Sequence, residues 1–346
     1  MPSSRGFSSA ARVIFVLAAF IIVVAGMRAA NSLMVTFLLS SFFAIICAPP
    51  FMYLLNKGVP AWVSLICVVI FICLLQLILI SIITTSVSDF SKDLPLYQER
   101  ISGLTGQFFN LLSSWGVDIP KDKVTEYFDP SAIFKLAVSA LGNLGGVLSN
   151  SFLIILTVIF MLFEGASIPA KLRTAFGENS THMRHIQRFL DTVKQYMTIK
   201  TVISLATGTV IYIWLLLLGV DYPLLWALLA FLFNFVPNIG SIIAAVPTVL
   251  LALIQLGPLY ALLTALGYVS VNMIMGNIIE PRYMGKGLGL STLVVFLSLV
   301  FWGWVFGPVG MLLSVPLTML LKIAFESSED TQWLAILMGP DIQEKS

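Results

Sequence analysis

Long apolar runs recur along the chain and are separated by short polar segments. A helix that crosses a bilayer needs about 20 apolar residues. The alternation of apolar and polar residues that marks half-buried strands is absent, so the pattern predicts an all-α, polytopic helical membrane protein. The clearest spans are residues 13–30, 33–55, 61–84, 145–163, 199–218 and 257–276.

The composition supports this prediction and excludes a water-soluble globule. Of the 346 residues, 58% are apolar and only 10% are charged, whereas soluble domains carry about 25% charged residues. The formal net charge is +2 and no basic run is present, so we expect no nucleic-acid partner. Cys47, Cys67 and Cys73 lie within apolar runs without metal-ligand spacing, and we interpret them as small core residues.

The distribution of charge predicts which segments lie on which side of the membrane. Residues 85–143 hold five Lys and Arg against seven Asp and Glu, whereas residues 164–200 hold six against three. Because Lys and Arg accumulate in cytoplasmic segments, the second segment is expected in the cytoplasm and the first outside it. Both termini are then predicted to be cytoplasmic.

Two polar segments contain amphipathic helical patterns. In the outer segment, apolar residues spaced by three or four form one seam, which could contact another subunit or pack on the membrane helices of the same chain. In the cytoplasmic segment, a second apolar face indicates a helix along the inner leaflet; His182 and His185 lie there, but no neighbouring Cys supports a metal site. The two faces are Tyr97, Ile101, Leu104, Phe108, Leu111 and Trp115, and Met183, Ile186, Leu190, Val193 and Met197.

Two hydrophobic segments near the C-terminus are interrupted by Pro and Gly. Residues 222–256 should break near Pro237 because proline lacks a backbone donor and restricts the preceding residue, and residues 291–324 should break near Pro308. Each segment is either a re-entrant hairpin or a pair of kinked spans. Broken segments that enter from opposite faces are typical of secondary-transporter sites, so we predict a pathway here.

Residues 276–291 form the densest polar motif of the C-terminal half. A carboxylate at a helix centre costs about 2.5 to 3.5 kcal/mol on insertion scales, so Glu280 is expected at a boundary or in a wet cavity. If the preceding helix continues, Asn272, Gly276 and Glu280 share a face. Glu280 and Arg282 are too close in sequence to pair along one helix, so each should have a partner elsewhere.

Catalytic signatures are missing from the sequence. There is no His-Glu-x-x-His motif, no Gly-x-Ser-x-Gly motif and no His other than His182 and His185. The spacing around Gly285 and Gly287 also differs from that of a phosphate-binding loop. We therefore expect neither an enzyme nor a bound cofactor.

These observations divide the chain into consecutive regions. The C-terminal membrane region is expected to form the transport path. The regions are N-terminal membrane helices (1–84), an extracytoplasmic helical segment (85–143), a membrane helix (144–163), a cytoplasmic amphipathic helix (164–198), the C-terminal membrane region (199–325) and a cytoplasmic tail (326–346).

Three motifs carry a family resemblance that covers nearly the whole chain. Val236-Pro237-Asn238-Ile239-Gly240, Glu280-Pro281-Arg282-Tyr283-Met284-Gly285 and Gly287-Leu288-Gly289-Leu290-Ser291 resemble motifs of the autoinducer-2 exporter family of permeases. The resemblance implies a bacterial inner-membrane protein with about eight spans, a homo-oligomer, expected to be a pentamer, and outward movement of the quorum-sensing signal autoinducer-2. The family also contains sodium/proton antiporters.

The resemblance leaves the cargo and the coupling ion open. A small, mostly uncharged signal suits Asn side chains, which donate and accept hydrogen bonds, whereas a coupling proton or sodium ion suits Glu280. The alternatives are a sodium/proton antiporter and a passive channel or membrane scaffold. The expected pathway residues are Asn234, Pro237, Asn238, Gly240, Asn272, Asn277, Glu280 and Arg282, and the backbone should be shaped by Pro281, Gly285, Gly287, Gly289, Pro308 and Gly310.

Overall fold

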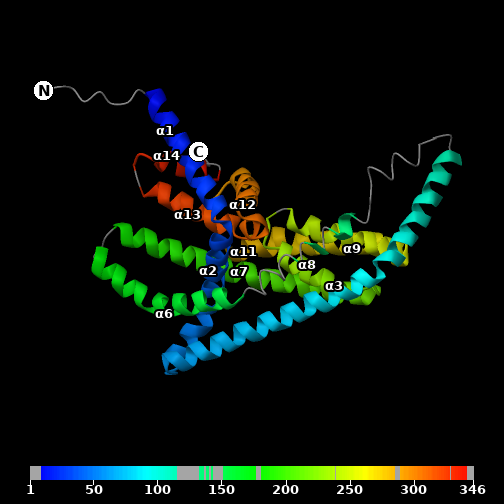
Figure 1. Ribbon diagram of the computed structural model, residues 1–346, viewed down its shortest axis with the longest axis horizontal. Coiled ribbons are helices and arrows are strands. Elements are labelled where there is room, and N and C mark those ends of the chain that lie inside the picture. The colour runs from blue at the N-terminus through cyan, green and yellow to red at the C-terminus, as the bar shows by residue number, and fades with distance from the viewer. Residues whose placement is uncertain are drawn as a thin grey trace.

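The computed structural model confirms a polytopic helical membrane protein (Figure 1). It describes residues 9–114, 132–135, 138–139, 142, 151–176, 181–237, 239–284, 289–327 and 329–340, and these contain no strand. The helices are α1 (Ser9–Ala29), α2 (Asn31–Asn56), α3 (Ala61–Ser114), α6 (Ser151–Phe176), α7 (Thr181–Leu218), α8 (Pro223–Phe233), α9 (Gly240–Leu256), α10 (Pro258–Asn272), the π-helix η1 (Met273–Ile279), α11 (Glu280–Met284), α12 (Thr292–Leu312), α13 (Ser314–Glu326) and α14 (Gln332–Leu337).

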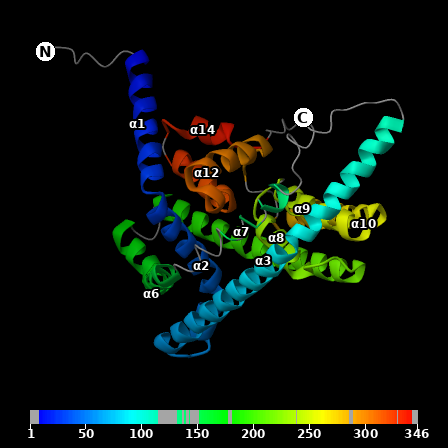
Figure 2. The ribbon, with the colours of Figure 1, turned by 45° about the vertical axis from the view of Figure 1, so that its right-hand side comes forward.

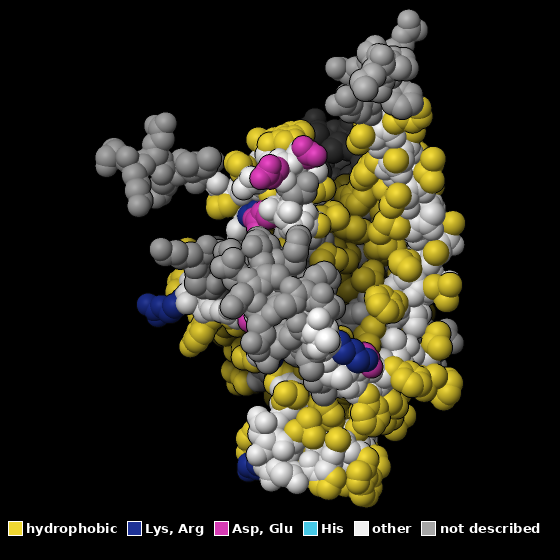
Figure 3. Space-filling model, turned by 90° about the vertical axis from the view of Figure 1, so that its left-hand side faces the viewer, with side chains coloured by type: hydrophobic (Ala, Val, Ile, Leu, Met, Phe, Trp, Pro, Cys, Tyr) yellow, Lys and Arg dark blue, Asp and Glu magenta, His cyan; other side chains and the backbone are white. Residues whose placement is uncertain are grey.

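The exposed side chains are those of a protein surrounded by lipid. Five helices of the described chain are long and apolar enough to cross a bilayer, and four shorter apolar helices accompany them. Ile22 is 71% exposed, Trp62 64% and Leu217 76%, and hydrophobic side chains cover much of the face shown in Figure 3. Such a surface is stable only in an apolar solvent.

Helix α3 is much longer than its predicted span. It continues for 54 residues, roughly 80 Å, and extends beyond the other helices (Figures 1 and 2). Tyr97, the first residue of the predicted seam, is 2% exposed and stacks on Phe90 of the same chain with ring centroids 5.9 Å apart. At Tyr97 the seam therefore packs within the chain. The remaining side chains of the seam, from Ile101 to Trp115, lie outside the described residues.

The link between α7 and α8 is held by three helices at once. The Tyr97 hydroxyl donates to Asp221 Oδ2 (2.8 Å), the Asp221 amide donates to Gln255 Oε1 (2.9 Å) and Trp226 Nε1 donates to the Asp221 carbonyl (3.0 Å). Tyr222 adopts a left-handed backbone conformation (φ 56°) and its hydroxyl donates to Asp93. Burial, followed by this hydrogen bond, raises the pKa of Tyr222, so its hydroxyl remains a donor.

The predicted cytoplasmic helix over 164–198 is not a separate element. Its first part completes α6, and the rest begins α7, which runs without interruption into the predicted span from residue 199. Val193 and Met197 are buried in the main apolar cluster, so this part of the face packs on the protein. The side chains of Met183 and Ile186, and those of His182 and His185, lie outside the described residues.

Both predicted helix breaks are present. Helix α8 ends at Phe233 and α9 begins at Gly240, and α12 is broken at Gly307, whose backbone has φ 64° and ψ −147°. A Cβ on Gly240 would overlap the Phe233 carbonyl, and a Cβ on Gly310 would overlap the Trp302 carbonyl. Each turn therefore needs a glycine because backbone approaches backbone there.

The two turns pack into one apolar cluster. Phe235 from the first turn and Val309 from the second are buried together with residues of α2, α6, α7 and α13. The Phe42 ring of α2 meets Phe235 edge to face, with centroids 5.8 Å apart. The broken backbone is therefore enclosed by protein, as an interruption at membrane depth requires.

We predict that Gly240→Ala and Gly310→Ala each destabilise the protein by about 1–3 kcal/mol, the usual cost of overpacking. The readout is the unfolding temperature in detergent. The matched control is Gly165→Ala in α6, where an added Cβ meets no atom within 4 Å. An unfolding temperature for both turn variants as high as that of the control would contradict the prediction.

Candidate functional site

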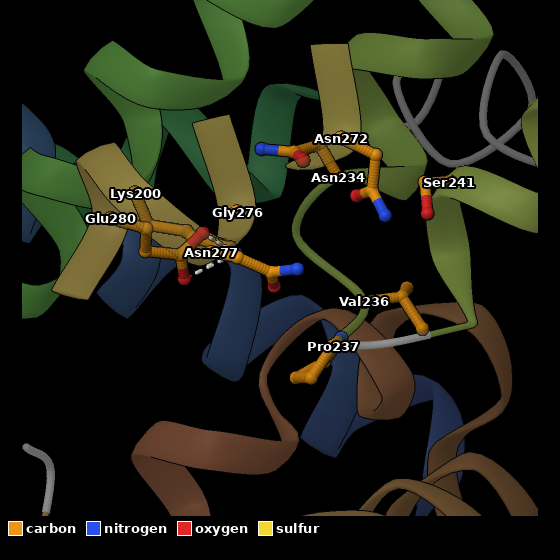
Figure 4. Close-up of a pocket in the computed structure, with 9 residues that line it drawn as sticks. All are labelled: Lys200, Asn234, Val236, Pro237, Ser241, Asn272, Gly276, Asn277 and Glu280. Atoms are coloured by element: carbon orange, nitrogen blue, oxygen red, sulfur yellow. Dashed lines mark hydrogen bonds and ion pairs between the residues drawn. The ribbon is translucent and has the colours of Figure 1, made fainter. Parts of the chain in front are cut away.

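A cavity of about 170 Å³ lies between α7, the α8–α9 turn, α9 and the helix formed by α10, η1 and α11 (Figure 4). Its lining combines one cation, one carboxylate and three amides with a hydroxyl group. The lining residues are Lys200, Asn234, Val236, Pro237, Ser241, Asn272, Gly276, Asn277 and Glu280. This is a polar cavity inside a protein whose helices are predominantly apolar.

The strongest interaction in the cavity is an ion pair between Lys200 of α7 and Glu280 of α11. Lys200 Nζ lies 2.7 Å from Glu280 Oε1 and 2.8 Å from Oε2, and the two side chains are 5% and 18% exposed. Removing charges from water costs several kcal/mol per ion, which close pairing offsets. The pairing therefore offsets much of the cost of burying either group.

A continuous helix brings Glu280 to the cavity. Helix α10 continues through the π-helix η1 into α11, so Asn272, Gly276 and Glu280 line the same side, as expected if the helix continued. The π-helical turn is wider than an α-helical turn and is frequent at functional sites. Pro281 is the second residue of α11, where its missing N–H leaves a carbonyl of the preceding turn without its usual donor.

The amide groups come from different elements. Asn234, in the α8–α9 turn, donates from Nδ2 to the Ser204 hydroxyl of α7 (2.9 Å). Asn272 and Asn277 are exposed side chains at the cavity, and Figure 4 shows the Asn234 and Asn272 amides near each other, on the side of Ser241. The cavity thus offers both donors and acceptors to a small polar molecule.

The structure brings together some of the predicted pathway residues. Five of them line the cavity: Asn234, Pro237, Asn272, Asn277 and Glu280. Gly240 is buried and shapes the adjacent turn, whereas Arg282 is exposed and does not line the cavity. Asn238, Gly285 and Gly287 lie outside the described residues.

The remaining motif residues have structural positions away from the cavity. The Gly289 backbone has φ 66° and its carbonyl accepts a hydrogen bond from Lys322 Nζ (2.5 Å). Pro308 and Gly310 lie in the second broken turn. These residues shape the backbone in and around the second broken segment, and none of them is among the residues that line the cavity.

Sequence reasoning missed Lys200, Ser204 and Ser241. Lys200 was assigned to the basic segment 164–200, and nothing in the spacing connects it to Glu280, which is 80 residues away. The available signal was chemical, because Glu280 required a partner and Lys200 is the last base before the uncharged residues 201–220. The expectation that Glu280 pairs outside its own helix is confirmed.

A polytopic helical fold, broken helices and a polar, charged cavity are together typical of membrane transporters. Comparison with known proteins agrees. The chain matches the family described as AI-2E family transporter over residues 14–330, and it belongs to that family. Because this family and the relatives below are described as transport proteins, the chain is a transporter and not an enzyme.

Relatives in bacteria cover nearly the whole chain. A Haemophilus influenzae protein, described as a transport protein without a named substrate, is 44% identical over 338 residues, which cover 95% of this chain and 96% of the relative. The Escherichia coli AI-2 transport protein TqsA is 39% identical over 328 residues, with 95% of each chain covered. The Escherichia coli protein YhhT is 37% identical over 324 residues, with 94% and 93% covered.

We predict that replacing one partner of the ion pair destabilises the protein more than replacing both partners. Lys200→Met or Glu280→Gln alone should cost about 3–5 kcal/mol, because each leaves a buried charge unpaired, whereas the double variant should recover much of the loss. The readout is a double-mutant cycle of unfolding temperatures in detergent. The control is Lys171→Met, whose pair with Glu164 is 64% and 55% exposed and should change stability by less than about 1 kcal/mol.

Additive losses in the double variant would contradict this prediction, because independent sites give additive effects and paired sites do not.

Proposed function

We propose that the chain is a secondary exporter that moves a small polar signal of the autoinducer-2 type out of the cytoplasm of a bacterium, driven by a proton or sodium gradient. The observation that carries the proposal is the Lys200–Glu280 ion pair in a polar cavity beside the broken α8–α9 turn. Discontinuous helices of this kind form the substrate and ion sites of secondary transporters.

The cavity chemistry supports a small, hydroxyl-rich cargo. Autoinducer-2 is small, polyhydroxylated and mostly uncharged, and the relative TqsA is described as an AI-2 transport protein. Hydroxyl groups both donate and accept hydrogen bonds, as do the amides of Asn234, Asn272 and Asn277. A volume of about 170 Å³ suits a molecule of this size and excludes a peptide or lipid.

The charge distribution supports outward movement across the inner membrane. With the basic segment 164–200 on the cytoplasmic side, both termini are cytoplasmic and Lys200 lies in the cytoplasmic half of the span Leu190–Leu218. The cavity then lies nearer the cytoplasm, where a signal made inside the cell would enter it. A homo-oligomer, expected to be a pentamer, remains our prediction for the assembly.

In this proposal, Glu280 couples transport to an ion gradient. A proton or a sodium ion on the carboxylate would replace Lys200 as its partner, because one carboxylate cannot fully satisfy both cations. Release of Lys200 would separate α7 from α11 and open the cavity. The ion pair thus gives two states whose balance the ion and the cargo both change.

The ion pair also favours a second candidate, a sodium/proton antiporter that carries no signal. A passive channel or scaffold is the third candidate, and it predicts transport without dependence on a gradient. Transport assays on purified protein in proteoliposomes distinguish the three candidates. An exporter moves autoinducer-2 when a gradient is applied, and an antiporter exchanges sodium for protons without autoinducer-2. A channel moves its solute at the same rate with or without either gradient.

We predict that Glu280→Gln lowers gradient-driven accumulation of autoinducer-2 about tenfold, a size typical of coupling energies, while exchange without a gradient persists. The measurement is uptake into proteoliposomes at equal protein abundance. The control is Glu164→Gln, which removes an exposed carboxylate on α6 and should transport normally. If Glu280→Gln accumulates autoinducer-2 under a gradient as strongly as the unmodified protein does, Glu280 has no coupling role.

A further inference from the structure

We propose that a seam of buried hydroxyl groups between α7, α9 and α10 carries cargo from the cavity toward the opposite end of the bundle, and that it admits uncharged polar molecules and rejects ions. This inference rests on the transport function proposed above. We define the hydroxyl seam as Ser204, Thr207, Thr248, Thr264 and Tyr268.

The seam begins at the cavity and follows the contact between α7 and α10. These helices are antiparallel, because Lys200 meets Glu280 at one end and Trp214 Nε1 donates to the Leu263 carbonyl (3.2 Å) further along. Trp214 can approach α10 because Gly267 has no side chain, and a Cβ at that position would overlap the indole. Thr207 lies midway between Lys200 and Trp214, on the same helical face by its spacing of seven.

The seam continues between α9 and α10. Thr248 and Tyr268 are 0% and 5% exposed, and their hydroxyl oxygens lie 3.1 Å apart. Ser241 lies seven residues before Thr248 on the same side of α9 and lines the cavity. Thr264 lies one turn beyond Tyr268 on α10 and is fully buried.

Two hydroxyl groups of the seam have no hydrogen-bond partner among the described residues. They are the Oγ1 atoms of Thr207 and Thr264, whose residues are 7% and 0% exposed. A buried polar group without a partner costs about 1–3 kcal/mol, and valine would fill the same space without that cost. Hydroxyls on a passing solute would supply the missing hydrogen bonds.

The sequence around the seam contains no formal charge. Residues 201–220 and 222–279 include no Asp, Glu, Lys, Arg or His, so charged groups are confined to Lys200 and Glu280 at one end and Asp221 at the other. An ion moving between these ends would meet no counter-ion, and a charge is costly at membrane depth. An uncharged polyol would replace its hydrogen bonds to water by hydrogen bonds to the hydroxyl groups of the seam, at little cost. The seam therefore admits the cargo and excludes the coupling ion.

The test replaces the two unpaired hydroxyls by Thr207→Val and Thr264→Val. The matched controls are Thr209→Val and Ser270→Ala, on exposed faces of the same two helices. The probes are autoinducer-2 and erythritol for uncharged cargo, and sodium for ions, each measured in proteoliposomes of the full chain. Unfolding temperature in detergent is measured for every variant.

We expect each seam variant to move both uncharged probes about tenfold more slowly, the size of effect expected when a hydrogen bond to a polar group is lost. Unfolding temperatures should be equal or higher, because an unpaired buried hydroxyl has been removed, and sodium flux should match that of the unmodified protein. A variant that is more stable yet slower for uncharged cargo cannot be explained by misfolding.

Two results would contradict the role of the hydroxyl seam without contradicting the proposed exporter. The first is unchanged transport of both uncharged probes in both variants. The second is a loss of sodium flux equal to the loss of uncharged-probe transport. If the unmodified protein moves neither uncharged probe under any gradient, the proposed exporter and the seam fail together. The behaviour of the unmodified protein therefore shows which of the two proposals has failed.

Discussion

The ion pair between Lys200 and Glu280 is the interaction on which the arrangement of the C-terminal membrane region depends. Leaving either charge unpaired at membrane depth is costly, so their pairing favours one register of α7 against α11. That register in turn aligns α7 with α10, where the Trp214 indole packs against Gly267. A single electrostatic requirement thus positions the cavity and the helices that lead away from it.

Interrupted helices supply the second constraint. Pro237 and Pro308 remove backbone donors, and Gly240 and Gly310 let the chain after each break approach a carbonyl of the helix before it. A backbone broken in this way needs enclosure, because free carbonyl and amide groups are unstable in lipid. The apolar cluster around Phe235 and Val309 provides the enclosure, while the opposite side of the first turn faces the polar cavity. The first break therefore packs against apolar side chains on one side and lines the polar cavity on the other.

Local patterns predicted the apolar helices, both breaks and the face shared by Asn272, Gly276 and Glu280, because these features depend on residues close in sequence. The pairing of Glu280 with Lys200 depends on a contact between elements 80 residues apart, which periodicity does not encode. The lengths of α3 and α7 were missed because polar residues continue a helix as readily as they end it, and α3 continues even through Pro95. The π-helix leaves no distinct signal in residue spacing.

The hydrogen bonds around Asp221 have a mechanical consequence. Its carboxylate, amide and carbonyl are each held by a different helix, α3, α9 and α8. Each of the three helices can shift relative to the link only by breaking its own hydrogen bond to Asp221, so the link ties them together at this end. The two ends of α7 are thus held differently. Three separate hydrogen bonds fix the link that follows it, whereas beside the cavity an ion pair joins it to α11, and an ion pair is the kind of contact that a bound cation can disrupt.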